Sequence, residues 1–170
     1  MKKGIDQQVI LQNNQMLQKA IGVLGGGLNF EATVSTSTAQ LAQQVLAHNG
    51  LLISEHPPFK EEDPYIISKT YRIIAGLAKA MVLIQSDLID SCRYGVRTFA
   101  GLNRPFGVID FSQHVDFNKS ISFAANRIIL QKKKEGIADF GKLKPDVSVR
   151  LSKIIGIKGL QDYEVLIDGI

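Results

Sequence analysis

The sequence predicts an α/β fold in which a mostly parallel sheet of about four to six strands is covered by helices on both faces. Two observations point to this class. Short runs of apolar residues alternate along the chain with segments of helical spacing. The runs are apolar throughout rather than at every second residue, as in strands buried on both faces. A chain of 170 residues, 45% of them hydrophobic, is long enough to build one such core.

Four apolar runs are the expected strands, at residues 20–24, 51–54, 81–85 and 106–110. The expected helices lie at residues 7–19, 38–48, 66–78, 92–102 and 123–134. After the last of these, the pattern indicates a short edge strand at 137–140 and a final helix at 147–155. We therefore expect an α/β domain over residues 1–140 and a helical extension over residues 141–170.

Charge and cysteine usage narrow the function classes. The 20 basic residues exceed the 16 acidic ones by four, a surplus that permits a polyanionic partner but is far from a histone-like composition. The single cysteine, Cys92, excludes an internal disulfide and a multi-thiolate zinc site. No apolar run approaches the ~18 residues of a membrane span. We expect a cytoplasmic protein that does not contact a membrane.

The sequence indicates neither a metal centre nor catalytic machinery. The three histidines, His48, His56 and His114, are scattered without the spacing of metal ligands. Asp87, Asp90 and Asp110 fall near the ends of expected strands, but a neighbouring arginine would pair with any of them as readily as a substrate would. We therefore predict no catalytic residue, no metal and no cofactor.

A glycine cluster marks the end of the first expected strand, where open α/β sheets bind ligands. Gly25, Gly26 and Gly27 follow Leu24 directly. Glycines let backbone N–H groups approach a phosphate closely, because no side chain intervenes. The same residues would also make a tight strand-to-helix turn, and no dinucleotide or phosphate-loop fingerprint accompanies them. Both interpretations stay open.

Two basic groups follow the second and third expected strands. Residues 68–72 combine two cations with two hydroxyls beside the start of an apolar helical stretch, a combination that suits a phosphodiester backbone. Arg93 and Arg97 are four residues apart and share one helix face, and Arg104 follows them. A solvated helix surface explains the first group equally well. The candidate phosphate-binding residues are Lys69, Arg72, Arg93 and Arg97.

Several motifs resemble, in order and spacing, those of the DNA-processing protein A (DprA/Smf) family. They are Gly4-Ile5-Asp6, residues 21–29 around the glycine cluster, residues 50–58, residues 72–77 and residues 125–129. The resemblance extends from about residue 4 to residue 140. The family domain opens with a strand, a helix and a second strand that are expected to be missing before Gly4. Such a shortened member would fill the gap by forming a homodimer, or would receive the missing part from another gene product.

The resemblance implies a Rossmann-like, three-layer domain that binds single-stranded DNA and helps to load a RecA-type recombinase in transformation or recombination. It adds Asn126 to the candidate DNA-binding residues, because Asn126 stands in the family's Gly-Thr-Asn element. Some positions depart from the family pattern. Thr70 and Tyr71 replace an arginine and an asparagine of its basic motif, and Asp110 replaces a proline.

Two other functions stay open. A nucleotide-binding or nucleotide-hydrolysing protein would use the same sheet edge, although the Pro-Gly-Gly-x-Gly-Thr-x-x-Glu motif of phosphoribohydrolase relatives does not occur in this sequence. A decayed, noncatalytic interaction module would bind neither nucleotide nor DNA. Salt-sensitive binding of single-stranded DNA would distinguish the first function from both of these.

Overall fold

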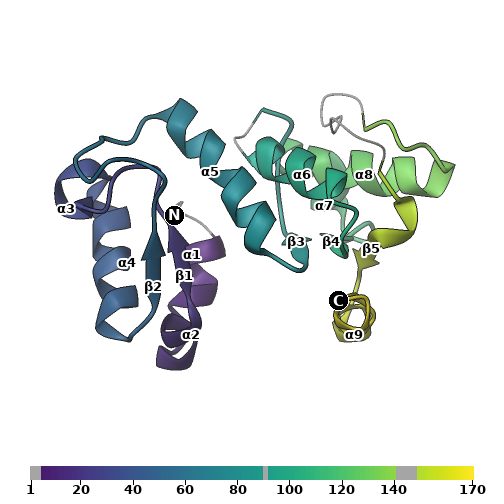
Figure 1. Cartoon of the computed structure of the whole chain (residues 1–170). Coiled ribbons are helices and arrows are strands. Elements are labelled where there is room, and N and C mark those ends of the chain that lie inside the picture. Colours follow the sequence, from purple (N-terminus) through teal and green to yellow (C-terminus); the bar gives the residue numbers. More distant parts are fainter. Residues whose placement is uncertain (1–4, 90–91, 141–148) are drawn as a thin grey trace. The chain divides into compact units, whose positions relative to one another are not determined.

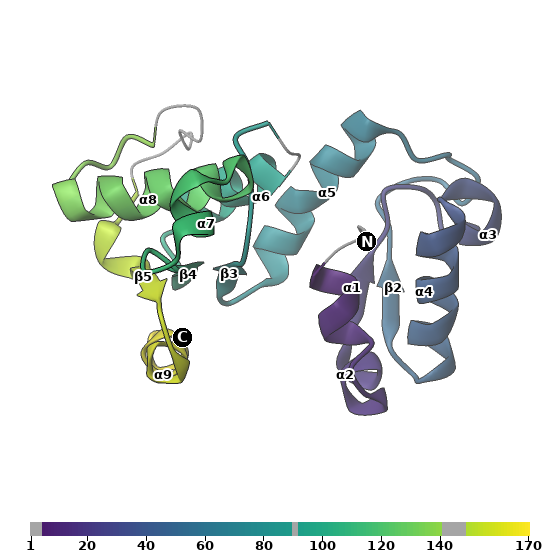
Figure 2. The same ribbon diagram turned by 180° about the vertical axis from the view of Figure 1, so that it is seen from behind.

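The structure is a computed structural model that describes residues 5–89, 92–140 and 149–170. The chain divides into two compact units, Met1–Ile73 and Ile74–Ile170. Figures 1 and 2 show their elements from opposite sides. Each unit combines parallel strands with helices. The predicted Rossmann-like α/β class is therefore confirmed, although the strands form two separate sheets.

Unit 1 contains a two-stranded parallel sheet in which β1 (Ile21–Val23) pairs with β2 (Leu51–Ile53). Its helices are α1 (Ile5–Ile10), α2 (Asn14–Lys19), α3 (Phe30–Thr33) and α4 (Thr36–Ala47), and α5 (Pro64–Leu77) begins in this unit. The single helix expected at residues 7–19 is divided in two. The division has a local cause, because the Asn13 side chain accepts the Met16 N–H at 3.0 Å and starts α2 as its N-cap.

The core of unit 1 lies on one face of its sheet. It consists of Leu17 of α2, Ala42 and Val45 of α4, Leu52 of β2 and Leu24, which directly follows β1. Ile21 and Leu51 are register partners, and each is about half exposed. Parallel sheets are normally covered on both faces. In unit 1, the side chains at the amino ends of β1 and β2 are instead left partly uncovered.

Unit 2 contains a three-stranded parallel sheet in the order β3 (Met81–Leu83), β4 (Phe106–Ile109), β5 (Ile154–Ile157). Its helices are α6 (Cys92–Gly101), α7 (Val115–Lys119), α8 (Ala124–Glu135) and α9 (Leu160–Asp168), with short 3-10 turns at η1 (Ile121–Phe123) and η3 (Leu151–Lys153). The 3-10 turn η1 connects α7 to α8. Ser120 is its N-cap, and the Ser120 hydroxyl accepts the Ser122 N–H at 3.2 Å.

Alternate residues of β4 serve two different cores in unit 2. Phe106 and Val108 pack in the larger cluster, which α6 and α8 cover. Ile109 packs instead in a smaller cluster with Leu166 of α9. Successive strand side chains point to opposite faces of a sheet, so both faces of the unit 2 sheet are covered by helices, as the sequence predicts.

Two predictions near the C-terminus are wrong. Residues 137–140 form no strand, and residues 149–155, the described part of the expected final helix at 147–155, form no α-helix; residues 147 and 148 lie outside the described residues. Phe140 is instead fully buried in the larger core. The third strand is β5, whose β-branched isoleucines pair with β4. The domain boundary expected at residue 140 stays a prediction.

Candidate functional site

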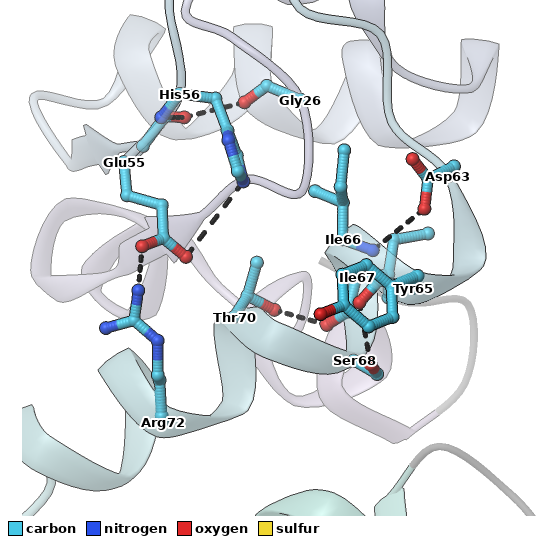
Figure 3. Close-up of polar contacts among 11 residues, drawn as sticks. Gly26, Glu55, His56, Asp63, Tyr65, Ile66, Ile67, Ser68, Thr70 and Arg72 are labelled. Carbon is cyan, nitrogen blue, oxygen red and sulfur yellow. Dashed lines mark hydrogen bonds and ion pairs between the residues drawn. The ribbon is translucent and has the colours of Figure 1, made fainter.

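The glycine turn after β1 is buried and hydrogen-bonded within unit 1. The Gly27 N–H donates to the Lys60 carbonyl at 2.8 Å. The Gly26 carbonyl accepts the Ser54 hydroxyl at 2.7 Å, a bond drawn in Figure 3. These backbone groups are therefore already engaged by the segment that follows β2.

Close packing explains why this turn contains glycines. A Cβ atom at Gly27 would lie 2.1 Å from the Pro57 carbonyl oxygen, and one at Gly26 would lie 2.6 Å from the Thr33 carbonyl oxygen. Real Cβ atoms do not approach backbone so closely. Gly25 is also tight, with 2.8 Å between its ideal Cβ and the Ile67 side chain. These contacts support the tight-turn interpretation, and phosphate binding by the three glycines stays a prediction.

The two cations of the first basic group lie on exposed positions of α5. The Lys69 ammonium lies 5.0 Å from the centroid of the Tyr65 ring, one turn earlier in the helix. The Arg72 side chain is 58% exposed and forms an ion pair with the Glu55 carboxylate. Lys69 and Arg72 are three residues apart on one helix, so both cations face a similar direction.

The Glu55 carboxylate contacts both Arg72 and His56 (Figure 3). One of its carboxylate oxygens contacts the Arg72 guanidinium, and the other lies 4.0 Å from Nε2 of His56. The Arg72 contact links the segment after β2 to α5. Arg72 therefore already binds an oxyanion in this structure, supplied by the protein itself.

The Ser68 and Thr70 hydroxyls of the first basic group are hydrogen-bonded within α5, and ligand binding by residues 68–72 stays a prediction. They lie within α5 rather than at its start. The Ser68 hydroxyl donates to the Tyr65 carbonyl at 2.6 Å, and the Thr70 hydroxyl donates to the Ile67 carbonyl at 2.7 Å. Both residues are buried. Such bonds to the preceding turn are a common arrangement for Ser and Thr inside helices.

Arg93 and Arg97 lie one turn apart on α6 in unit 2. The Arg93 guanidinium lies 5.0 Å from the centroid of the Tyr94 ring, and its Nη2 donates to the Tyr94 hydroxyl at 3.2 Å. Arg97 is exposed. The two candidate pairs, Lys69 and Arg72 on α5 and Arg93 and Arg97 on α6, therefore belong to different units.

Asn126 is completely buried in unit 2. Its Nδ2 donates to the carbonyls of Leu83, Ile84 and Ile109 at 3.3, 3.0 and 3.2 Å. Its Oδ1 accepts the Ser86 N–H at 3.3 Å. The side chain thus joins α8 to the carboxyl ends of β3 and β4. This geometry gives Asn126 a structural role beneath the sheet edge, and its predicted contact with DNA stays untested.

Arg104 caps the C-terminus of α5. Its Nη1 donates to the carbonyls of Ala75, Gly76 and Ala78 at 3.1, 3.0 and 2.6 Å. Those carbonyls form the negative end of the helix dipole, where a cation is favourable.

Sequence reasoning missed two residues. Glu55, the partner of Arg72, lies 17 positions away along the chain, and no local pattern links the two. Phe111, at the carboxyl end of β4, is in contact with the rings of Phe117 and Phe123. A signal for that cluster was present, because the three phenylalanines recur at a spacing of six residues.

The described residues contain no group of three or more His, Cys, Asp or Glu side chains positioned to hold a metal ion. No helix in the described part of the chain combines the length and the apolar character needed to cross a membrane.

Comparison with known proteins identifies related sequences. A family model described as DNA recombination-mediator protein A matches residues 1–134. The chain is 30% identical over 82 residues to the DNA processing protein DprA of Bacillus subtilis (strain 168). The aligned region covers 48% of this chain and 27% of that relative, so the chain spans far less than half of the relative's length. No solved structure matches.

Proposed function

Because this chain belongs to the DNA recombination-mediator protein A family, we propose that it acts in DNA processing by binding single-stranded DNA through backbone phosphates. Family membership associates the chain with DNA processing in general terms. The single-stranded form of the ligand and the residues that contact it are the new content of the proposal.

The observation that supports the proposal best is the ion pair between Arg72 and Glu55. A guanidinium that holds a carboxylate has the geometry to hold a phosphate, since both anions present paired oxygens. Arg72 is more than half exposed, and Lys69 is exposed one turn away on α5. Both residues lie within the region that matches the family.

In this proposal Glu55 competes with DNA for Arg72. A phosphate must replace the Glu55 carboxylate, so the free energy needed to break the ion pair lowers the net affinity for DNA. Exposed ion pairs contribute only about 0–1 kcal/mol, so a phosphate can displace Glu55. Arg93 and Arg97 provide a second, independent pair of phosphate contacts in unit 2.

The test is a titration of fluorescently labelled oligothymidylate at two salt concentrations. The parent should bind with an affinity that falls as salt rises, with a log–log slope of roughly −0.7 per phosphate contact. Lys69→Ala/Arg72→Ala should weaken binding roughly 10- to 30-fold at about 0.1 M salt and reduce the slope by about 1.4. Glu55→Gln should have the opposite effect and strengthen binding, because it releases Arg72.

A matched control removes the same charge elsewhere. Lys132→Ala/Lys134→Ala deletes two cations near the end of α8, Lys132, which is partly exposed and paired with Glu135, and Lys134, which is exposed. This variant should leave the affinity within a factor of two or three of the parent. An equal loss in both double variants would mean that net charge, rather than the α5 pair, attracts DNA. Absence of parent binding at low salt would refute the proposed function.

We extend the proposal to two protein partners, a RecA-type recombinase and a second copy of this chain. The resemblance to the family supports both, and so does the half-exposed face formed by Ile21 and Leu51 in unit 1 for self-association. Sedimentation of the purified chain measures the oligomeric state, and co-sedimentation with a purified recombinase on single-stranded DNA measures loading. A monomer that fails to recruit the recombinase would contradict this extension while leaving DNA binding intact.

A further inference from the structure

The carboxyl end of β4 carries an aromatic ring that is 41% exposed, that of Phe111. Its centroid lies 5.9 Å from His114, 6.4 Å from Phe117 and 6.5 Å from Phe123. The interplanar angles of these three contacts are 89°, 84° and 80°. Neighbours that stand perpendicular hold the ring in place without stacking flat on it. None of the three neighbours is stacked flat on Phe111, and the residue keeps 41% of its surface exposed.

Hydrogen bonds fix the loop that presents this ring. Oδ1 of Asp110 accepts the Ser112 N–H at 3.0 Å, and the His114 N–H donates to the Phe111 carbonyl at 2.8 Å. Nδ2 of Asn118 donates to the Ser112 carbonyl at 2.8 Å. The loop is thus arranged before any ligand arrives, which lowers the entropic cost of binding.

A cation lies at the same edge of the sheet. Ile109 and Ile157 are register partners at the ends of β4 and β5, and Lys158 follows directly. The Lys158 side chain is 60% exposed, and its Nζ lies 3.6 Å from Oδ2 of Asp110. In α/β sheets the carboxyl ends of parallel strands are the usual place for ligands.

We propose that Phe111 is a stacking site for one base of single-stranded DNA, with Lys158 contacting an adjacent phosphate. The inference rests on the proposed function and adds to the α5 and α6 cations a further contact surface in unit 2, one that contacts a base as well as the backbone. Aromatic rings stack on every base, so the site should show little sequence preference.

The absence of tryptophan from the sequence permits a direct test. Phe111→Trp introduces a single tryptophan whose fluorescence should be quenched when oligothymidylate binds, because the base stacks on the indole. Val165→Trp, at an exposed position on α9, is the matched control and should show no quenching at saturation. Quenching in both variants, or in neither, would overturn the stacking site.

A second measurement separates the contribution of contacts to bases from that of contacts to the DNA backbone. Phe111→Ala should weaken binding of oligothymidylate roughly 5- to 100-fold and leave binding of an abasic oligomer of equal length unchanged. Lys69→Ala/Arg72→Ala should weaken binding of both oligomers. Phe111→Leu preserves apolar packing without an aromatic face, so it should behave like Phe111→Ala even if the alanine variant folds poorly.

The outcomes distinguish this inference from the proposed function. If the parent binds both oligomers and Phe111→Leu binds them as the parent does, only the stacking site is wrong. If the parent binds neither oligomer, the proposed function is wrong and the stacking site falls with it. Binding of free thymidine monophosphate as tightly as the oligomer would identify a nucleotide site instead, and would also overturn the inference.

Discussion

The carboxyl ends of β1 and β4 each lead into a loop of their own unit, but the two loops are built in opposite ways. The turn after β1 is closed, because its glycines are buried and the segment after β2 takes up their backbone groups. The loop after β4 is more open, because Phe111 is exposed there and Lys158, which follows the neighbouring strand β5, is exposed as well. The glycine turn after β1, which has the composition of a ligand site, is thus tightly packed. The loop after β4 carries no such sequence signal, yet it is exposed to solvent.

The difference teaches that glycines have two physical uses at a strand end. They admit a ligand where the space beside them is empty, and they admit the protein's own backbone where it is full. Only the positions of neighbouring atoms distinguish the two uses. At Gly27 the neighbours are the carbonyls of Pro57 and Pro58, and both arrive from far along the chain.

The largest effect should come from removing the buried amide of Asn126. Asn126→Ala deletes four hydrogen bonds, three of them buried and one partly buried, that join α8 to β3, β4 and the residues after β3. We expect a loss of about 3 kcal/mol or more in the free energy of unfolding. Urea denaturation measures this loss. Hydrogen exchange should show that amides of β3 and β4 lose protection while those of β1 and β2 keep theirs.

Asn118→Ala is the matched control, because its amide bonds are on the exposed surface and should contribute less than about 1 kcal/mol. Equal destabilisation by the two variants would show that burial of Asn126 is not what makes its bonds important.

A smaller but still large effect should follow from filling the closed turn. Gly27→Ala places a Cβ within 2.1 Å of a backbone oxygen, and the required shift should cost about 2 to 4 kcal/mol. Gly76→Ala is the control, since nothing lies within 4 Å of its ideal Cβ in α5. There alanine should stabilise the helix by about 0.5 to 1 kcal/mol. Thermal denaturation distinguishes the two substitutions.

This pair also decides between packing and phosphate binding. If Gly27→Ala folds with unchanged stability and loses affinity for oligothymidylate, the closed turn is a ligand cradle after all. The contrast between the two strand ends would then disappear.

The smallest effect concerns the start of α9, in unit 2. The backbone N–H groups of Lys158 and Gly159 donate to Asp162 at 2.7 and 3.0 Å and hold the pKa of its carboxyl below the usual 3.8. The ionised form is favoured by folding. The stabilisation is therefore present above the unfolded-state pKa and is lost as pH falls through the lower folded-state value.

Asp162→Asn should accordingly reduce the dependence of the unfolding free energy on acid between about pH 5 and about pH 2. Measuring urea midpoints of parent and variant across that range checks this. Identical acid profiles would show that these two hydrogen bonds do not stabilise the start of α9.

Much of the fold could be predicted because local patterns determine it. The four apolar runs became β1 to β4, and helices occur near each of the five expected positions. The C-terminal strand was misplaced because residues 137–140 and 154–157 are both short and apolar, and periodicity alone cannot say which run pairs with β4. The burial of Phe140 and the pairing of Ile154 depend on tertiary contacts.

The candidate site was less predictable for the same reason. Lys69, Arg72 and Arg97 lie on exposed positions, as charged residues usually do. The engagement of Arg72 by Glu55 and of Arg104 by the end of α5 could not be foreseen, because ion pairs and caps join residues distant in sequence. Asn126 shows most clearly what sequence patterns cannot predict. It is a polar residue in a motif shared with the family, and yet it is completely buried.

The alternation along β4 constrains how this protein can change during evolution. Phe106 and Val108 belong to one core and Ile109 to the other, so deleting or inserting a single residue would turn these side chains to the opposite faces and disrupt both cores at once. The fold can tolerate single substitutions in β4, but it cannot tolerate a change in the length of that strand. Variation in length should therefore concentrate in the loops, and β4 should keep a constant length among related chains while its composition drifts.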